Sequence, residues 1–295
     1  MTPGIDAPGF RLPGGIRLGT VALQVADLER SLDFYVRVLG FRVTGRDQSP
    51  GGRAARLGIS GDESVLLELQ EKPGVRPVPR RGRLGIYHFA VLLPSRQDLG
   101  RFLRHATSLD VHVGSSEHLV SEALYLVDPD GITVEVYRDR PRAEWPYRDG
   151  EVLAAILPLD SDAVLAAAED RPWRGLPAGT IIGHMHFYVE DIPAAEAFYH
   201  AALGFDKTAW SLPGMLFLSA GGYHHHVGVN VWAAGSPEAT EDDARLLSWE
   251  LLLPERTTAE AAAASLRRAG YDVTAAGGAW LARDPWGITV RLGSD

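Results

Sequence analysis

A long internal repeat is the feature that most limits how this chain can fold. The stretch Asp27–Tyr35, followed by Leu39–Phe41 (LGF), returns as Asp191–Tyr199, followed by a second LGF at Leu203–Phe205. A second echo closes each half, where Asp128–Val134 (DPDGITV) matches Asp284–Val290 (DPWGITV). The chain is therefore a duplicated unit, and its function depends on where the two copies differ.

Each half divides again into two similar pieces. The first piece opens with an alternating strand over residues 21–25, followed by a helix that Asp27 can cap and Gly40 can end. Three short strands follow, separated by Gly-rich turns. The second piece has the same order, with a strand at 87–93, a helix at 97–107 and a turn at 128–131. The pattern predicts an α+β chain of four βαβββ units.

The length of 295 residues suits two domains, each able to bury its own core. We expect an N-terminal extension over residues 1–16, a first domain over 17–138 and a second domain over 180–295. The connecting segment 139–179 is predicted to contain a short helix near 162–169. It is expected to be packed rather than solvated, because it carries Trp145, Tyr147 and Trp173.

Composition excludes several classes of function. A net charge of −9 argues against a nucleic-acid partner, and no apolar run is long enough to cross a membrane. We therefore expect a cytoplasmic protein without a membrane partner. The chain has no cysteine, so any metal must be bound by His, Asp and Glu, which suits Fe(II), Mn(II) or Ni(II) as well as Zn(II).

The order of elements, with the Phe-Tyr…Leu-Gly-Phe helix and the Asp-Pro-Asp-Gly turn, resembles the vicinal oxygen chelate superfamily. This group includes glyoxalase I, fosfomycin- and bleomycin-resistance proteins and extradiol ring-cleaving dioxygenases. Three segments are similar to two-domain catechol 2,3-dioxygenases: Tyr87–Arg96, His118–Leu126 and Ser219–Asn230. The resemblance implies an α+β fold in which four βαβββ units pair into two glyoxalase-like domains with open, cleft-forming mixed sheets.

The resemblance also implies a metal site in the first domain. There the family's ligand positions, on the first and last strands of each unit, fall at Thr20, Glu68, His88 and Glu135. His88 and Glu135 match the family pattern, and a carboxylate on the cleft face of a buried sheet needs a cation as partner. Thr20 is a poor ligand, so Glu68 is expected as the third. The alternatives are an Arg ion pair for Glu135, a hydrogen-bonded core imidazole for His88 and an exposed strand position for Glu68.

The second domain departs from this pattern. His184 matches a family metal position, but Ser248 and Arg291 occupy the positions of His88 and Glu135. An alternative metal cluster would combine His184 with His226.

Three further residues are expected to act on the substrate, again by resemblance. His225 would lie beside the metal and handle protons, and His118 and Tyr125 would line the substrate pocket. A polar hairpin of solvated imidazoles stays an alternative for His225, and a loop His with a core Tyr for His118 and Tyr125.

The resemblance implies a metal-dependent extradiol dioxygenase of a catechol- or hydroquinone-like small aromatic. Its cofactor would be a divalent metal, Fe(II) in the first place, with Mn(II), Ni(II) or Zn(II) as alternatives. Its partners would be the aromatic substrate and O2, within a homodimer. Two other classes stay open. Glu68 and the missing first His favour a glyoxalase-like isomerase or lyase, and Thr20, Ser248 and Arg291 favour a protein that sequesters a small molecule or drug.

Overall fold

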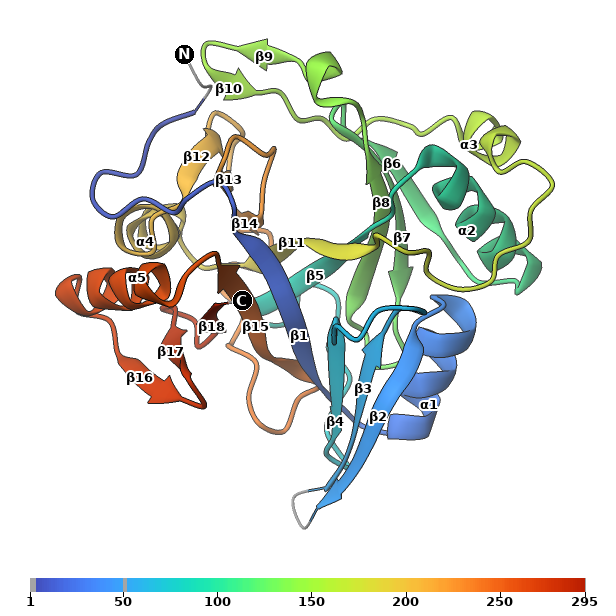
Figure 1. Cartoon of the computed structure of the whole chain (residues 1–295), viewed down its shortest axis with the longest axis horizontal. Helices are drawn as coiled ribbons and strands as arrows, with labels where there is room; N and C mark the ends of the chain where they lie inside the picture. Colours follow the sequence, from blue (N-terminus) through green and yellow to red (C-terminus); the bar gives the residue numbers. More distant parts are fainter. Residues whose placement is uncertain (1–3, 50–51, 295) are drawn as a thin grey trace.

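The computed structural model describes residues 4–49 and 52–294, which form two large sheets flanked by short helices (Figure 1). The strands of the first half are β1 (Arg17–Val25), β2 (Arg42–Ser49), β3 (Gly52–Gly58), β4 (Leu67–Glu71), β5 (Gly85–Leu92), β6 (Gly114–Glu117), β7 (Ser121–Val127) and β8 (Thr133–Asp139). Those of the second half are β11 (Ile181–Tyr188), β12 (Asp206–Ala209), β13 (Met215–Ser219), β14 (Val227–Asn230), β15 (Arg245–Leu253), β16 (Val273–Ala276), β17 (Ala279–Arg283) and β18 (Thr289–Ser294). The helices outside the connecting segment are α1 (Leu28–Leu32), η1 (Asp33–Val38), α2 (Arg96–Ser108), α4 (Ile192–Ala195), η3 (Glu196–Ala202) and α5 (Arg256–Arg268).

The two sheets confirm the predicted α+β class, and each sheet combines both halves of the chain. One sheet has the order β12-β13-β14-β11-β5-β8-β7-β6, and the other has the order β16-β17-β18-β15-β1-β4-β3-β2. The central joins are antiparallel pairs, β5 with β11 and β1 with β15. The second βαβββ unit therefore pairs with the third, and the first with the fourth. We call these the inner-unit sheet and the outer-unit sheet.

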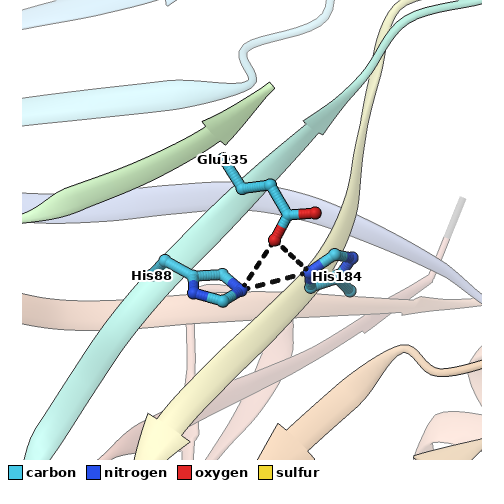
Figure 2. Close-up of side chains that lie close together, drawn as sticks. All are labelled: His88, Glu135 and His184. Atoms are coloured by element: carbon cyan, nitrogen blue, oxygen red, sulfur yellow. Dashed lines mark hydrogen bonds and ion pairs between the residues drawn. The ribbon is translucent and has the colours of Figure 1, made fainter. Parts of the chain in front are cut away.

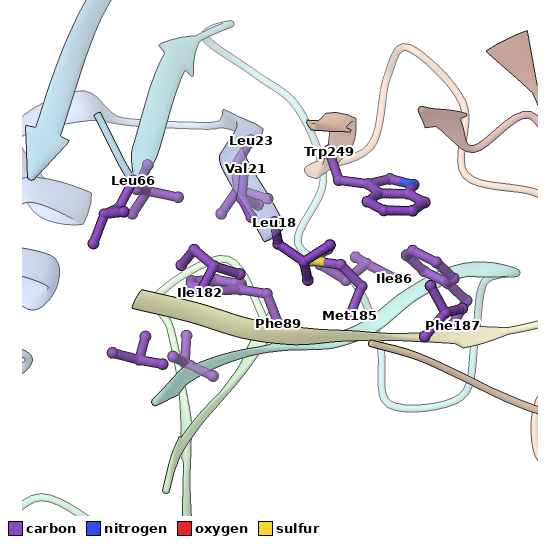
Figure 3. Packing of buried hydrophobic residues seen from close by; sticks show 14 of the residues in the cluster. Leu18, Val21, Leu23, Leu66, Ile86, Phe89, Ile182, Met185, Phe187 and Trp249 are labelled. Carbon is purple, nitrogen blue, oxygen red and sulfur yellow. The ribbon is translucent and has the colours of Figure 1, made fainter. Parts of the chain in front are cut away.

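The main core lies between the two sheets (Figure 3). Phe89 of β5 and Met185 of β11 point from the inner-unit sheet toward Leu23 of β1 and Trp249 of β15 in the outer-unit sheet. All four side chains are at most 1% exposed, and burying this apolar surface stabilises the contact between the sheets. Because side chains alternate along a strand, the neighbours of Phe89 and Met185 point to the opposite face of the inner-unit sheet.

The repeated sequence motifs form a repeated structural contact. The hydroxyl of Tyr35 donates to Asp128 Oδ2 at 2.9 Å, and the hydroxyl of Tyr199 donates to Asp284 Oδ2 at 2.9 Å. Burial raises the pKa of each of these two carboxyl groups to about 7. Each contact joins the helix of one unit to the turn before the last strand of the next unit. The repeated Tyr and Asp residues therefore stabilise the fold.

The first helix begins and ends where the sequence predicts. Asp27 caps it by accepting a hydrogen bond from the Arg30 N–H at 3.0 Å, and the helix widens through η1 before Leu39. Gly40 follows with φ of +89°, and a Cβ there would lie 2.7 Å from the Gly175 Cα. A residue other than glycine would strain this end of the helix.

The connecting segment is ordered and packed, as predicted for two of its aromatic residues. It contains η2 (Arg142–Glu144), β9 (Tyr147–Arg148), β10 (Glu151–Val152) and α3 (Ser161–Ala167). Trp145 is buried and Trp173 is half-buried, but Tyr147 is 40% exposed, so the expectation for Tyr147 was wrong. Among the described residues, no helix is both long and apolar enough to span a membrane.

Candidate metal centre and active-site cavity

Three buried side chains converge on the face of the inner-unit sheet that points away from the core (Figure 2). His88 Nε2 lies 3.0 Å from Glu135 Oε2, and His184 Nε2 lies 3.2 Å from the same oxygen. The two imidazole nitrogens are themselves 3.2 Å apart. Each of the three residues is 2–3% exposed.

Sheet register brings these three side chains together. Ala90 of β5 is the pairing partner of both Glu135 in β8 and His184 in β11, so these two residues flank it. His88 lies two positions before Ala90 and therefore points to the same face. The methyl group of Ala90 leaves space above the strand, into which the three longer side chains reach.

The three donors fit a divalent metal. Atoms bound about 2.1 Å from a metal, at right angles to one another, lie about 3.0 Å apart, close to the observed separations. Burial alone raises the pKa of Glu135, but its interactions with His184 and His88 outweigh that effect and hold the pKa well below its usual range. Burial lowers the pKa of His88. A carboxylate and neutral imidazole are the forms that bind metals.

The structure corrects the prediction that Glu68 is the third ligand. Glu68 lies in β4 of the outer-unit sheet and accepts a hydrogen bond from Gln70 Nε2 at 2.7 Å. The ligand positions of the first half are split between two sheets, because the second unit pairs with the third. Thr20 shares the outer-unit sheet, where Arg291 Nε donates to Glu250 Oε1 at 3.0 Å. His184 takes the third place instead.

The alternative pairing of His184 with His226 is also wrong. His226 Nδ1 is hydrogen-bonded to Ser219 Oγ at 2.9 Å, and His226 is not one of the clustered donors. Burial lowers its pKa to about 3. In the third unit, the position that corresponds to Glu135 is Gly228, where a Cβ would lie 2.9 Å from the His186 ring. The cluster therefore has three donors rather than four.

A cavity of about 290 Å³ opens beside the three donors. It is lined by aromatic, apolar and imidazole side chains, and no Arg or Lys in the described part of the chain lines it. The lining residues are Tyr87, His88, His118, Val120, Ser121, Tyr125, Glu135, Val152, Ala154, Ala155, Ile156, His184, His186, Leu212, Met215, Phe217, His224, His225 and Trp232.

His118 and Tyr125 lie together in this cavity wall. The carbonyl oxygen of Ala155 can only accept, so His118 donates to it through Nδ1 at 2.7 Å. His118 Nε2 is then an acceptor, and the Tyr125 hydroxyl donates to it at 2.7 Å. Burial raises the pKa of Tyr125 well above its usual value, so the phenol keeps its proton. The phenol oxygen can still accept a hydrogen bond.

His225 lies on the other side of the donors. Its ring stacks on Phe217 with centroids 4.4 Å apart, and its centroid is 4.1 Å from that of the His184 ring. His225 therefore lies next to one of the three clustered side chains, and its action on a substrate stays a prediction.

Several lining residues were not foreseen from the sequence. His186 lies opposite His88 in the β5–β11 pair, and Asn230 Nδ2 donates to its Nε2 at 2.9 Å. Alternation with His184 along β11 was a signal for His186. The residues 152–156 of the connecting segment gave no such signal, because only the tertiary structure places them against the cavity.

Comparisons with known proteins agree with this geometry. The family model described as Glyoxalase/Bleomycin resistance protein/Dioxygenase superfamily matches residues 17–136. A catechol-2,3-dioxygenase of Bacillus subtilis (strain 168) is 39% identical over 272 residues, which cover 91% of this chain and 93% of that protein. A lactoylglutathione lyase of Neisseria meningitidis serogroup A is 31% identical over 124 residues, 41% of this chain and 88% of that protein.

The fold agrees as well. The crystal structure of a Bacillus subtilis subsp. subtilis str. 168 protein, provisionally described as a dioxygenase, covers 97% of this chain and 86% of its own. Its TM-score is 0.67 at 14% sequence identity. Relatives in this superfamily imply a divalent metal, and the His88, Glu135 and His184 cluster is suited to bind one. The chain belongs to the glyoxalase/bleomycin resistance protein/dioxygenase superfamily.

Proposed function

We propose that this protein is an extradiol-type dioxygenase that cleaves the ring of a small catechol- or hydroquinone-like aromatic, with Fe(II) bound by His88, Glu135 and His184. The observation that carries this proposal is the convergence of two imidazoles and one carboxylate on one side of a single point. Two His and one carboxylate are typical of non-haem Fe(II) oxygenases. When bound, such a metal supplies a Lewis acid with open positions for adjacent substrate oxygens.

The residues around the donors suit an aromatic diol. The Tyr125 hydroxyl, oriented by His118, would accept a hydrogen bond from one substrate hydroxyl. His225 would hold a proton of the second hydroxyl on the opposite side. Tyr87 and Phe217 supply flat apolar surfaces for the ring and exclude water from it.

The cavity favours a substrate without a charged substituent. Its volume lies near the lower end of the range for small-molecule sites. A carboxylate on the substrate would be buried there without a cationic partner, which is costly. We therefore propose uncharged, alkyl- or unsubstituted catechols as the preferred class.

A matched pair of substitutions tests the function. Glu135→Gln removes the carboxylate from the cluster, whereas Glu68→Gln makes the same chemical change in the outer-unit sheet. We expect Glu135→Gln to lose Fe(II) binding and oxygen uptake with catechol, and Glu68→Gln to keep both. Fe(II) titration and an oxygen electrode give the two readouts.

The same assay separates the other classes. Turnover of catechol that persists in Glu135→Gln, or that persists without O2, would contradict a dioxygenase. Activity under strict anoxia would indicate an isomerase or lyase instead. The absence of both turnover and stoichiometric metal in the unmodified protein would indicate a protein that sequesters small molecules.

A further inference from the structure

A chain of hydrogen bonds leads away from His225 through residues that the proposed function leaves unexplained. His225 Nδ1 lies 2.7 Å from His224 Nδ1, in the segment between β13 and β14. His224 Nε2 lies 2.8 Å from Asp139 Oδ1, at the end of β8. The imidazoles of His225 and His224 are thus hydrogen-bonded to each other, and the Asp139 carboxylate binds the His224 ring.

This order of partners determines the positions of the ring protons. A carboxylate only accepts, so His224 carries its proton on Nε2 and donates it to Asp139. When both imidazoles are neutral, His224 Nδ1 is a lone pair, and the contact at 2.7 Å then places the proton on His225 Nδ1. The remaining nitrogen of His225, Nε2, has no hydrogen-bond partner among the described residues, and the ring lines the cavity.

The surroundings keep His224 in this orientation. The residue is 1% exposed, the Thr208 hydroxyl donates to its backbone carbonyl at 2.6 Å, and the Trp145 ring lies 5.1 Å from its imidazole. The buried ring is thus packed against Trp145, and its Nε2 faces Asp139.

Asp139 has a second support. The Tyr223 hydroxyl donates to Asp139 Oδ1 at 3.3 Å and lies 2.7 Å from the hydroxyl of Tyr137. Gly183 makes this arrangement sterically feasible, because a Cβ at that position would lie 1.9 Å from the Tyr137 hydroxyl oxygen. The carboxylate thus contacts a connected pair of phenols, of which Tyr137 is fully buried.

We propose that Asp139 and His224 are positioning residues that hold His225 in its Nδ1–H tautomer and so present the Nε2 lone pair to the substrate. The inference deepens the proposed function, on which it rests. Asp139 and His224 act through His225, in the way that a buried carboxylate fixes the tautomer of a catalytic histidine elsewhere. A substrate hydroxyl would meet an acceptor at His225 rather than a second donor.

Nitrogen NMR of the full-length protein tests the tautomer directly. With ¹⁵N-labelled histidine, in the metal-free and the Zn(II)-titrated protein, we expect the His225 Nδ1 signal in the N–H range and Nε2 in the lone-pair range. Asp139→Ala is expected to give His225 shifts averaged between the two neutral tautomers, because His224 loses its hydrogen bond to Asp139. Glu68→Gln, in the outer-unit sheet, leaves the bond from His224 to Asp139 in place and is expected to keep the original His225 shifts.

The kinetic readout separates positioning from a general structural effect. Asp139→Ala should lower kcat on the order of 10- to 100-fold, with KM and metal content nearly unchanged. Asp139→Glu should restore part of that loss. A proton on His225 Nε2 in the unmodified protein would overturn the proposal, even if Asp139→Ala does not fold. Unchanged His225 shifts in Asp139→Ala would overturn it too. A rise in KM together with a loss of bound metal in Asp139→Ala would also overturn it. The Glu135→Gln result is independent of the nitrogen shifts, so failure of either proposal can be recognised.

Discussion

Ala90 lies between two of the three converging donors, since it pairs with both Glu135 and His184. It is fully buried, and its methyl group points to the same face as His88. A small side chain at this position is therefore a condition for the metal centre, although it donates nothing to a metal. The position is a steric one, and its effect can be separated from that of the donors.

Ala90→Val is expected to weaken metal binding on the order of 10- to 100-fold, because two added methyl groups enter the space where the donors converge. Ala55→Val, at an equally buried position of the outer-unit sheet, serves as the control and should keep the metal affinity. Titration with Fe(II) and Zn(II) measures both variants. Equal affinity in Ala90→Val and the unmodified protein would show that the space above Ala90 is not used.

At the scale of elements, the connecting segment does more than join the two halves, because it also forms part of the cavity. Four residues of this segment, Val152, Ala154, Ala155 and Ile156, form one wall of the cavity, and the Ala155 carbonyl orients His118. This wall is apolar and carries no cation, and we propose that it disfavours charged substrates.

The unmodified protein is expected to favour catechol over 3,4-dihydroxybenzoate at least about tenfold in kcat/KM, since burying an unpaired carboxylate costs more than 1.4 kcal/mol. Ala154→Arg should narrow or reverse this preference by giving the carboxylate a partner. Steady-state kinetics with both compounds provide the comparison. An unmodified enzyme that prefers the carboxylated compound would refute the assignment of the wall.

The contacts between helix and turn at Asp128 and Asp284 predict a pH dependence of stability. Burial raises the folded-state pKa of both carboxyl groups to about 7, whereas in the unfolded chain they ionise near pH 4. Between these values the folded state holds more protons, so the free energy of unfolding contributed by these groups falls as pH rises from about 4 to about 7.

The double variant Asp128→Asn, Asp284→Asn should lose this pH dependence, because an amide does not ionise. Denaturant unfolding of the metal-free protein at pH 5 and pH 8 measures the difference. The unmodified protein should lose on the order of 1 kcal/mol or more per carboxyl group relative to the variant over this range. A parallel pH dependence in both proteins would rule out neutral carboxyl groups in the fold.

For the whole molecule, the pairing of units across the two halves determines where the candidate metal site can form. Each sheet is completed by a strand pair that joins the halves, β5 with β11 and β1 with β15. The domain boundaries predicted at residues 138 and 180 separate His88 and Glu135 from His184. Neither half alone contains all three donors.

A fragment of residues 17–138 is therefore expected to bind metal far more weakly than the full chain. It should also self-associate, because β1 and β5 become open edges. Mixing it with residues 139–295 during refolding should recover both the size and the metal affinity of the intact protein. Size-exclusion chromatography and metal titration provide the test. A monomeric 17–138 fragment with full metal affinity would contradict the pairing seen here.

Local sequence patterns were sufficient to predict a large part of the fold. The cap at Asp27, the helix end at Gly40 and the faces of the strands follow from residue type and alternation, which depend only on near neighbours. His118 and Tyr125 were predicted to lie together because the segment His118–Leu126 resembles catechol 2,3-dioxygenases. His88 and Glu135 were predicted as a pair because they match the family's ligand positions, which lie on β5 and β8 of one unit.

The identity of the neighbouring unit, in contrast, follows from the long-range packing of the chain. A strand edge can pair with any complementary strand edge. The alternation of residues along a strand predicts which face of the sheet each side chain occupies, but it does not predict which strand pairs with it. The third donor, His184, lies across such an edge, whereas Glu68 is carried into the other sheet with its own strand. The cavity wall at residues 152–156 follows the same rule, since long-range packing rather than local pattern places it.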